Sequence, residues 1–276
     1  TAHRSQARVA RWCRKGSDSS SSYREVAVTE IQPNAAPRQS KRPATGIRDM
    51  TVLASSYDVV CIGGAMTGTA AAYFLSENPD FDGSVLVVEP DWTYDYANTT
   101  RAQNSIREQY TNPLNIQLSR FGAEFIADFH DRVQVDGQSP EINFRGTGYM
   151  FIAEDDAAYQ RLEGESVEQL AMGAEVEMLR PRQIAERYPY MDVDQFVGAR
   201  VGGQREGSFD GWAFFQGLRQ RAIHNHVTYI KDRVLGIDVD GGRVTSVRLA
   251  SGAQVGCGFA INAAGCRARE VAAMVG

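Results

Sequence analysis

The chain has 276 residues, of which 43% are hydrophobic and 23% charged, and no apolar run is long enough to predict a membrane span. Residues 1–49 carry ten Lys or Arg and four Asp or Glu, whereas the rest of the chain carries 19 and 30. The acidic body has no electrostatic reason to bind phosphate backbones, so nucleic acid is excluded as an expected partner.

The first 49 residues are rich in Arg, Ser and Pro and show little apolar periodicity. Such a segment buries too little apolar surface to offset the entropy of ordering it, so we expect residues 1–49 to be disordered. One interpretation is an organelle transit peptide, which would place the protein in the mitochondrial matrix. The favoured interpretation is an over-extended reading frame upstream of Met50, which predicts a cytoplasmic protein.

Residues 57–89 show the pattern of a strand, a glycine turn, a helix and a second strand that ends in an acid. The apolar run 58–62 is typical of a strand buried on both faces. The turn that follows it is Gly63-Gly64-Ala65-Met66-Thr67-Gly68. Its glycines would let the backbone approach a pyrophosphate, which the N–H groups of the helix N-terminus would bind. The alternative is an ordinary α/β turn with small residues for packing.

Glu89 closes the second strand, where it would accept hydrogen bonds from the ribose hydroxyls of adenosine. An acid at this place disfavours a 2′-phosphate, so NADP is not expected. Ala65 stands where the usual G-x-G-x-x-G pattern has its middle glycine, and its Cβ would crowd the phosphate.

After residue 89 the sequence predicts a helix, then an inserted unit of mixed helices and strands, and then further strands. After a polar loop at 90–100, Asn112-Pro113 would begin an amphipathic helix that continues to Phe129. Residues 139–207 are typical of an inserted α+β unit, and Asp210 would cap the helix that follows it. In the inserted unit we expect strands at 142–144, 149–152, 176–179 and 196–205 and helices at 155–171 and 181–188. Beyond it we expect a helix to 224, strands at 228–230, 234–239 and 244–249, and a last buried strand at 259–265.

Five stretches occur in the same order in the FAD-dependent oxidoreductases of the D-amino-acid oxidase, glycine oxidase and sarcosine oxidase superfamily. They are the turn at 63–68 with its strand and helix, the strand 85–89, the stretch 104–116, the segment 205–211, and Asn262-Ala263-Ala264-Gly265. On these motifs residues 57–276 resemble that superfamily, and most of all its FAD-dependent oxidoreductase-domain proteins.

The resemblance implies an α/β fold in two parts. A Rossmann-like FAD-binding domain at 50–138 and 208–276 would carry the start of an antiparallel α+β substrate domain at 139–207. Family members continue beyond the last strand, so the chain resembles the N-terminal two-thirds of such an enzyme, without the C-terminal third.

The resemblance also implies non-covalent FAD and assigns roles to single residues. The pyrophosphate would lie against Gly63, Ala65, Met66, Thr67 and Gly68, and the ribose against Glu89. The flavin would lie beside Thr100, Arg101, Asn104, Ser105 and Ile106. Val234 would meet the adenine end through its backbone, and Ala264 and Gly265 would touch the ribityl–pyrophosphate region. The loop 99–107 contains no His or Cys, so covalent attachment of the flavin there is not expected.

The implied reaction is oxidation of the C–N bond of an amino acid or N-methylated amine, with hydride transfer to flavin N5. A substrate carboxylate favours arginine, because the planar guanidinium donates two parallel hydrogen bonds. Arg107 resembles by position an arginine that contacts the substrate acid in sarcosine-oxidising relatives, and it is the catalytic candidate. The alternative is a surface or interdomain salt bridge. Oxygen, a quinone or an electron-transfer protein would reoxidise the flavin.

Residues for other chemistries do not form a pattern. His224 and His226 have no acidic or cysteine ligands near them in the sequence, and the four cysteines lack C-x-x-C spacing. We therefore expect no metal site, no disulfide framework and a reducing compartment.

Two other functions stay open. A flavoprotein that serves as an assembly or binding factor would hold FAD as a structural group with little turnover, since mitochondrial FAD-dependent oxidoreductase-domain proteins assist respiratory complex I. An NAD-dependent dehydrogenase would use the same strand–turn–helix unit, but the insertion and the late Ala-Ala-Gly strand argue against it.

Overall fold

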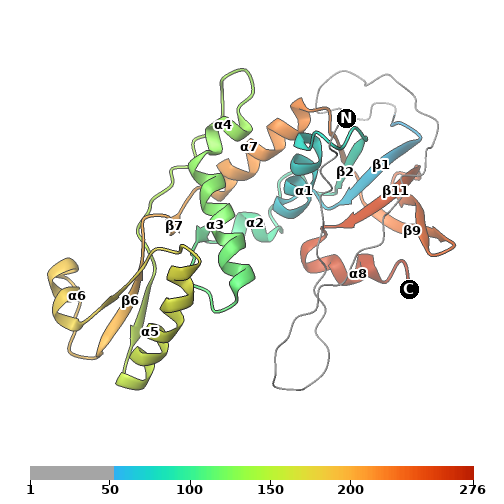
Figure 1. Cartoon of the computed structure of the whole chain (residues 1–276). Helices are drawn as coiled ribbons and strands as arrows, with labels where there is room; N and C mark the ends of the chain where they lie inside the picture. Colours follow the sequence, from blue (N-terminus) through green and yellow to red (C-terminus); the bar gives the residue numbers. More distant parts are fainter. Residues whose placement is uncertain (1–52) are drawn as a thin grey trace, which may run out of the picture. The chain divides into compact units, whose positions relative to one another are not determined.

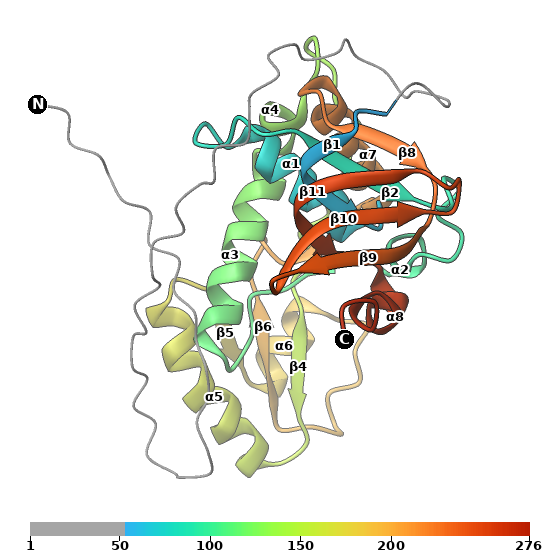
Figure 2. The same cartoon turned by 90° about the vertical axis from the view of Figure 1, so that its right-hand side faces the viewer.

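The computed structural model describes residues 53–276, and the predicted leader at 1–49 lies outside them. A six-stranded sheet in the order β8-β2-β1-β11-β10-β9 forms the first layer (Figure 2). Its strands are β1 (Ser56–Ile62), β2 (Val85–Glu89), β8 (Thr228–Lys231), β9 (Val234–Asp240), β10 (Arg243–Leu249) and β11 (Gln254–Asn262). Strands β8, β2, β1 and β11 run parallel, and β10 and β9 complete the sheet as an antiparallel hairpin.

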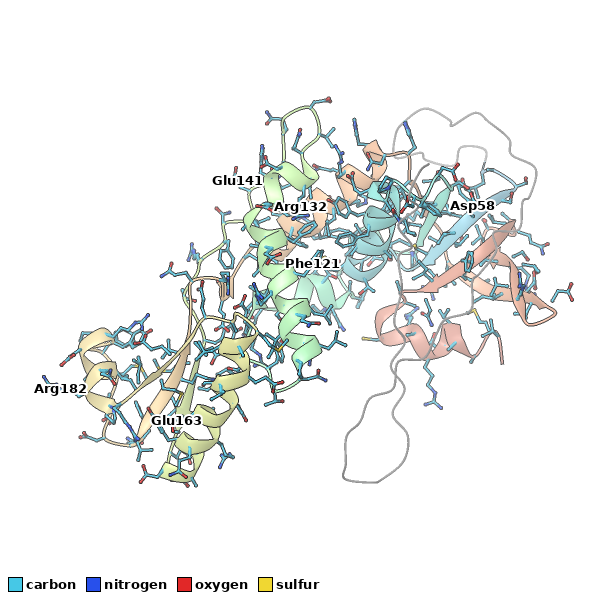
Figure 3. The ribbon with its side chains drawn as sticks, in the orientation of Figure 1. Asp58, Phe121, Arg132, Glu141, Glu163 and Arg182 are labelled. Carbon is cyan, nitrogen blue, oxygen red and sulfur yellow. The ribbon has the colours of Figure 1, made fainter. Side chains whose placement is uncertain are left out.

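The central strands β1 and β2 are joined by α1 (Met66–Glu77) and are buried on both faces, as their apolar runs predict. Val59 and Val87 pack into a cluster with α1 and α7 (Gly211–His224), whereas Val60 and Leu86 face the opposite side. Asp58, labelled in Figure 3, accepts hydrogen bonds from Ser84 N at 2.6 Å and Ser84 Oγ at 2.8 Å, which ties β1 to the residue before β2.

Helices cover one side of this sheet (Figure 1). They are α1 and α7, with α3 (Pro113–Ala127) and α4 (Phe129–Val133) packed on their outer side, while α2 (Asn98–Arg101) is a single turn in the loop after β2. Helix α3 begins as predicted, with Pro113 at its first position and the Asn112 side chain accepting from Leu114 N at 2.9 Å. The rings of Phe129 and Phe214 stack at 4.9 Å between α4 and α7, so aromatic residues form the core of this layer.

A three-stranded antiparallel sheet in the order β4-β6-β5 occupies the middle of the chain. Its elements are β4 (Met150–Ala153), α5 (Asp156–Ala171), β5 (Val176–Leu179), α6 (Pro181–Arg187) and β6 (Gly198–Gly202). The strand predicted at 142–144 is wrong, because β4 pairs with β6 and the preceding segment makes only an isolated bridge, Arg145 to Ser208. The predicted strand 196–205 is also too long, since pairing ends at Gly202.

A two-residue ladder connects the two parts of the chain. Strand β3 (Ser105–Ile106) pairs with β7 (Gly207–Ser208), with Ser105 opposite Ser208 and Ile106 opposite Gly207. After β11, the chain ends in the short helices η1 (Gly265–Arg267) and α8 (Ala268–Ala272). In residues 53–276, no helix combines the length and hydrophobicity that crossing a membrane requires.

Candidate functional site

The turn between β1 and α1 permits an unusually close approach of backbone segments. Gly63 has a φ of +102°, and a Cβ there would lie 2.5 Å from the carbonyl oxygen of Ala263. A Cβ at Gly68 would lie 1.8 Å from the carbonyl oxygen of Gly63. Only glycine at these positions lets the turn, the first turn of α1 and the end of β11 meet. The structure thus brings the predicted Gly63 beside both the predicted Gly68 and the predicted Ala264.

The N-terminus of α1 begins without a side-chain cap. Ala65 occupies the N-cap position with φ −73° and makes no side-chain capping hydrogen bond. The amide of Met66 donates to Thr99 Oγ1 at 3.1 Å, so the loop after β2 reaches the helix N-terminus. The N–H groups of a first helical turn and the positive end of the helix dipole favour a phosphate. Since φ at Ala65 is ordinary for any residue, alanine there adds no backbone strain.

Glu89 is held against the glycine turn. Its side chain is 8% exposed, with Oε2 accepting from Gly64 N at 2.8 Å and Oε1 from Asp91 N at 2.9 Å. A Cβ at Gly64 would lie 2.8 Å from Glu89 Cβ, so glycine makes room for the acid. Asp232 N donates to Glu89 O at 3.1 Å, which brings the segment leading into Val234 to the same place. A glycine cradle beside a buried acid is the donor and acceptor set that fits the pyrophosphate and ribose of an adenine dinucleotide.

The predicted flavin-side residues Thr100 and Arg101 shape their own loop. Thr100 Oγ1 donates to Tyr94 O at 2.7 Å, and Arg101 Nε donates to Asp95 O at 2.8 Å. The loop also approaches the end of β11, where Cys266 Sγ lies 3.6 Å from Asn98 Oδ1. Burial raises the pKa of Tyr94 to about 12, so its phenol stays neutral in this loop.

Residues 104–106 line the approach to α1. The carbonyl of Asn104 accepts from Phe209 N at 3.0 Å, and Ser105 and Tyr149 share a hydroxyl–hydroxyl hydrogen bond. Ile106 and Met66 line one apolar cavity of about 290 Å³ between α1, α3 and α7. Of the predicted flavin-side set, Ser105 and Ile106 therefore lie next to the predicted phosphate turn.

Arg107, the residue directly after β3, is half-buried. Its guanidinium carbon lies 4.7 Å from the centroid of the Tyr110 ring and 5.6 Å from that of Phe151. Among residues 53–276 no carboxylate lies within ion-pair distance of it. Aromatic faces attract the cation without using its hydrogen-bond donors, so the guanidinium N–H groups remain available to a ligand.

Two residues of the site were not predicted from the sequence. Thr99 accepts the amide of Met66, but its neighbour Thr100 has the same side chain, so residue type alone could not choose between them. Glu206 is 1% exposed and accepts from the amides of Glu108 and Gln109. It lies in a loop, where an acid usually indicates a solvated surface. In the described part of the chain, no group of His, Cys, Asp or Glu side chains gathers as a metal site.

Comparison with known proteins supplies a family match. Residues 58–276 match the family described as FAD dependent oxidoreductase, abbreviated DAO. The chain is 31% identical over 240 residues to FAD-dependent oxidoreductase domain-containing protein 1 of Xenopus laevis, covering 79% of this chain and 48% of that protein. The chain therefore spans about half the length of this relative.

Solved structures show the same fold at low identity. L-proline dehydrogenase from P. horikoshii superposes with a TM-score of 0.71 at 20% identity, over 81% of this chain and 56% of that one. Glycine oxidase from Bacillus cereus superposes with a TM-score of 0.62 at 20% identity, over 79% of this chain and 58% of that one. The predicted α/β fold class is confirmed.

Proposed function

The chain belongs to the DAO family of FAD-dependent oxidoreductases, and from this premise we propose that the protein oxidises the C–N bond of an amino acid or N-methylated amine. The names of the two superposed structures, L-proline dehydrogenase and glycine oxidase, support an amino acid as the substrate class. Because the chain spans about half the length of its relative, activity belongs to the whole protein and is assigned to it by this proposal.

The glycine turn and Glu89 support FAD as the cofactor. Gly63, Gly64 and Gly68 let the turn pack closely against the end of β11, against Glu89 and against its own backbone, and the first turn of α1 would supply N–H donors to a pyrophosphate. Both carboxylate oxygens of Glu89 keep a lone pair for a ribose hydroxyl, because each accepts one backbone N–H. Bound FAD would supply the hydride acceptor for the carbon next to the substrate nitrogen.

The observation that carries the substrate proposal is the guanidinium of Arg107, which has no ion-pair partner among residues 53–276. It lies on the rings of Tyr110 and Phe151, one residue after the strand β3 that borders the predicted flavin site. A planar cation held by aromatic faces, with its donors free, is suited to two parallel hydrogen bonds to a carboxylate. Arg107 would thus orient an amino acid by its acid group, and orientation of the reacting C–H is the main contribution that the protein makes.

The test is the Arg107→Ala variant of the FAD-loaded protein, with the rate of flavin bleaching by L-proline, glycine, sarcosine and D-amino acids measured under anaerobic conditions. We expect the limiting bleaching rate divided by the substrate dissociation constant, for the substrate that reduces the wild-type protein, to fall by a factor equivalent to about 2–4 kcal/mol, the range for a lost charge-assisted pair. Arg107→Lys should lose less, because it keeps the charge without the two-pronged geometry.

Arg187→Ala is the matched control, since Arg187 also lies over an aromatic ring, that of Tyr188 at 5.6 Å, but is paired with Glu177. It should leave the bleaching rate unchanged. Unaltered kinetics in Arg107→Ala would remove Arg107 from the substrate site. Bound flavin that no amine or amino acid bleaches would instead favour a factor with structural FAD.

A further inference from the structure

Glu206 lies in the loop before β7, where its carboxylate makes four hydrogen bonds. Oε1 accepts from Glu108 N at 2.7 Å and from Gln109 N at 3.2 Å. Oε2 accepts from Gln109 Nε2 at 2.8 Å and from Tyr149 N at 3.0 Å. All four donors are N–H groups, so both oxygens of the carboxylate act as acceptors in a site that excludes water.

These bonds fix the chain on both sides of Arg107. Before Arg107, Ile106 pairs with Gly207 in the β3–β7 ladder. After Arg107, the next two amides donate to Glu206, which directly precedes Gly207 in the sequence. One short segment therefore holds the backbone of Arg107 from its two ends, and the backbone cannot shift without breaking these bonds.

The same carboxylate also holds the segment that leads to Phe151, one of the two rings beneath Arg107. The amide of Tyr149 donates to it, and Phe151, two residues further along, carries the guanidinium of Arg107 on its ring. Gln109 extends the network, because its Oε1 accepts from Arg200 Nε at 2.8 Å. Arg200 is 2% exposed and its guanidinium carbon lies 5.3 Å from the Phe151 ring centroid. The Glu206 carboxylate thus holds the backbone next to Arg107, the segment that carries the Phe151 ring, and the side-chain amide of Gln109.

We propose that Glu206 is a positioning residue that holds Arg107 in the orientation that binds the substrate carboxylate. This inference rests on the proposed function, in which Arg107 contacts the substrate and Glu206 acts only through it. The restraint lowers the entropy that a mobile arginine would lose on binding its ligand. It also explains why an acid is buried here beside the candidate substrate arginine.

The experiment titrates benzoate, a planar carboxylate, into the FAD-loaded protein and follows the change in visible flavin absorbance. In Glu206→Gln an amide NH₂ replaces one oxygen and faces N–H donors, so the loop at 108–109 loosens. We expect the dissociation constant for benzoate to rise about 10- to 100-fold, the equivalent of one charge-assisted hydrogen bond. Because Glu206 acts through Arg107, Glu206→Gln combined with Arg107→Ala should bind benzoate no more weakly than Arg107→Ala alone.

Gly202→Ala provides a second variant if Glu206→Gln fails to fold. A Cβ at Gly202 would lie 1.7 Å from Glu206 Oε2, so alanine displaces the carboxylate while its charge stays. Gly164→Ala is its control, because a Cβ there meets no atom within 4 Å. Gly202→Ala should weaken benzoate binding in the same direction, and Gly164→Ala should not.

Three other results would contradict the role proposed for Glu206 or the role proposed for Arg107. Wild-type affinity in Glu206→Gln, together with weak binding in Arg107→Ala, would refute the positioning role and leave the proposed function intact. Additive losses in the double variant would also refute it, since a general structural defect adds to the loss of Arg107. A wild-type protein that carries flavin and binds no benzoate would overturn the substrate role of Arg107 and, with it, the role of Glu206.

Discussion

Gly68 is the residue at which the fit between α1 and the glycine turn is tightest. A Cβ there would lie 1.8 Å from the carbonyl oxygen of Gly63 and 3.2 Å from the Cβ of Ala263. The carbonyl oxygen belongs to the backbone of Gly63, the residue directly after β1, whose amide donates to Val88 O at 2.9 Å, so it cannot yield as a flexible side chain would. The space at Gly68 is therefore a requirement of the fold as well as of the proposed pyrophosphate site.

Gly68→Ala should lower the free energy of unfolding by roughly 1–3 kcal/mol, the range for overpacking a well-packed site, and should weaken FAD binding as the turn moves. Urea unfolding and a flavin absorbance titration measure the two effects. Gly164→Ala in α5 is the matched control, and it should stabilise the protein by about 0.5–1 kcal/mol as a helix-interior glycine replaced without contact. Equal stability of the two variants would contradict the tight approach at Gly68.

The residues of the site that belong to local sequence patterns could be predicted from the sequence. Gly63 and Glu89 were predicted because a glycine turn after a buried strand and an acid at the end of the next strand have few other uses. Glu206 was not, since its partner amide at Glu108 lies 98 residues away and no local pattern reports such a contact. The position of Arg107 was predicted by resemblance, and only the folded structure shows that the rings of Tyr110 and Phe151, and no carboxylate of the described residues, surround its guanidinium.

At the scale of elements, helices α1 and α7 are joined at their ends by one acid. Glu77, the last residue of α1, accepts from Arg221 Nε at 2.6 Å and from the side chain of Asn225. Burial alone raises the pKa of Glu77, but the hydrogen bonds from Arg221 and Asn225 and the Arg221 charge outweigh burial and lower the pKa below its ordinary 4.5. The ionised form is thus favoured in the folded state.

A lowered pKa in the folded state stabilises the protein above the ordinary value and ceases to do so as the pH falls through the folded value. We expect wild type to exceed Glu77→Gln in unfolding free energy by roughly 0.5–1 kcal/mol at pH 7, and the difference to shrink below pH 4.5 and to be lost as the pH falls through the lowered folded-state pKa. Urea unfolding over this pH range measures it. Glu186→Gln is the control, because its partner Arg182 is 90% exposed and the pair adds little. A pH-independent difference at Glu77 would show that packing, and not charge, joins the helices.

Element boundaries were predicted well where capping or turn residues set them. Asn112 and Asp210 cap α3 and α7 as predicted, and the hairpin between β9 and β10 turns at Gly241 and Gly242, both with positive φ. The strand predicted at 142–144 failed because a short apolar run does not identify its partner. Strand β4 pairs with β6, about fifty residues later, and only the folded chain decides that choice.

For the whole molecule, a ligand that binds only the folded state must stabilise it. We expect FAD at about 100 times its dissociation constant to raise the free energy of unfolding by about 2.7 kcal/mol. Flavin mononucleotide lacks the adenosine that Glu89 would hold, so at equal concentration it should stabilise the protein less. Thermal unfolding followed by circular dichroism compares the two. Equal stabilisation by both flavins would show that the turn and Glu89 do not bind the adenosine half.

The pairing of β1 with β11 also has a consequence for how the chain folds during its synthesis. Val59 lies opposite Phe259, two hundred residues later, so one side of the central strand has no partner until nearly the whole described chain has been translated. At ribosomal rates of roughly 5–20 residues per second, that delay is on the order of 10–40 s. Throughout it, β1 and β2 present an unpaired apolar edge to the surrounding solution, which is the form of nascent chain that aggregates unless a chaperone shields it.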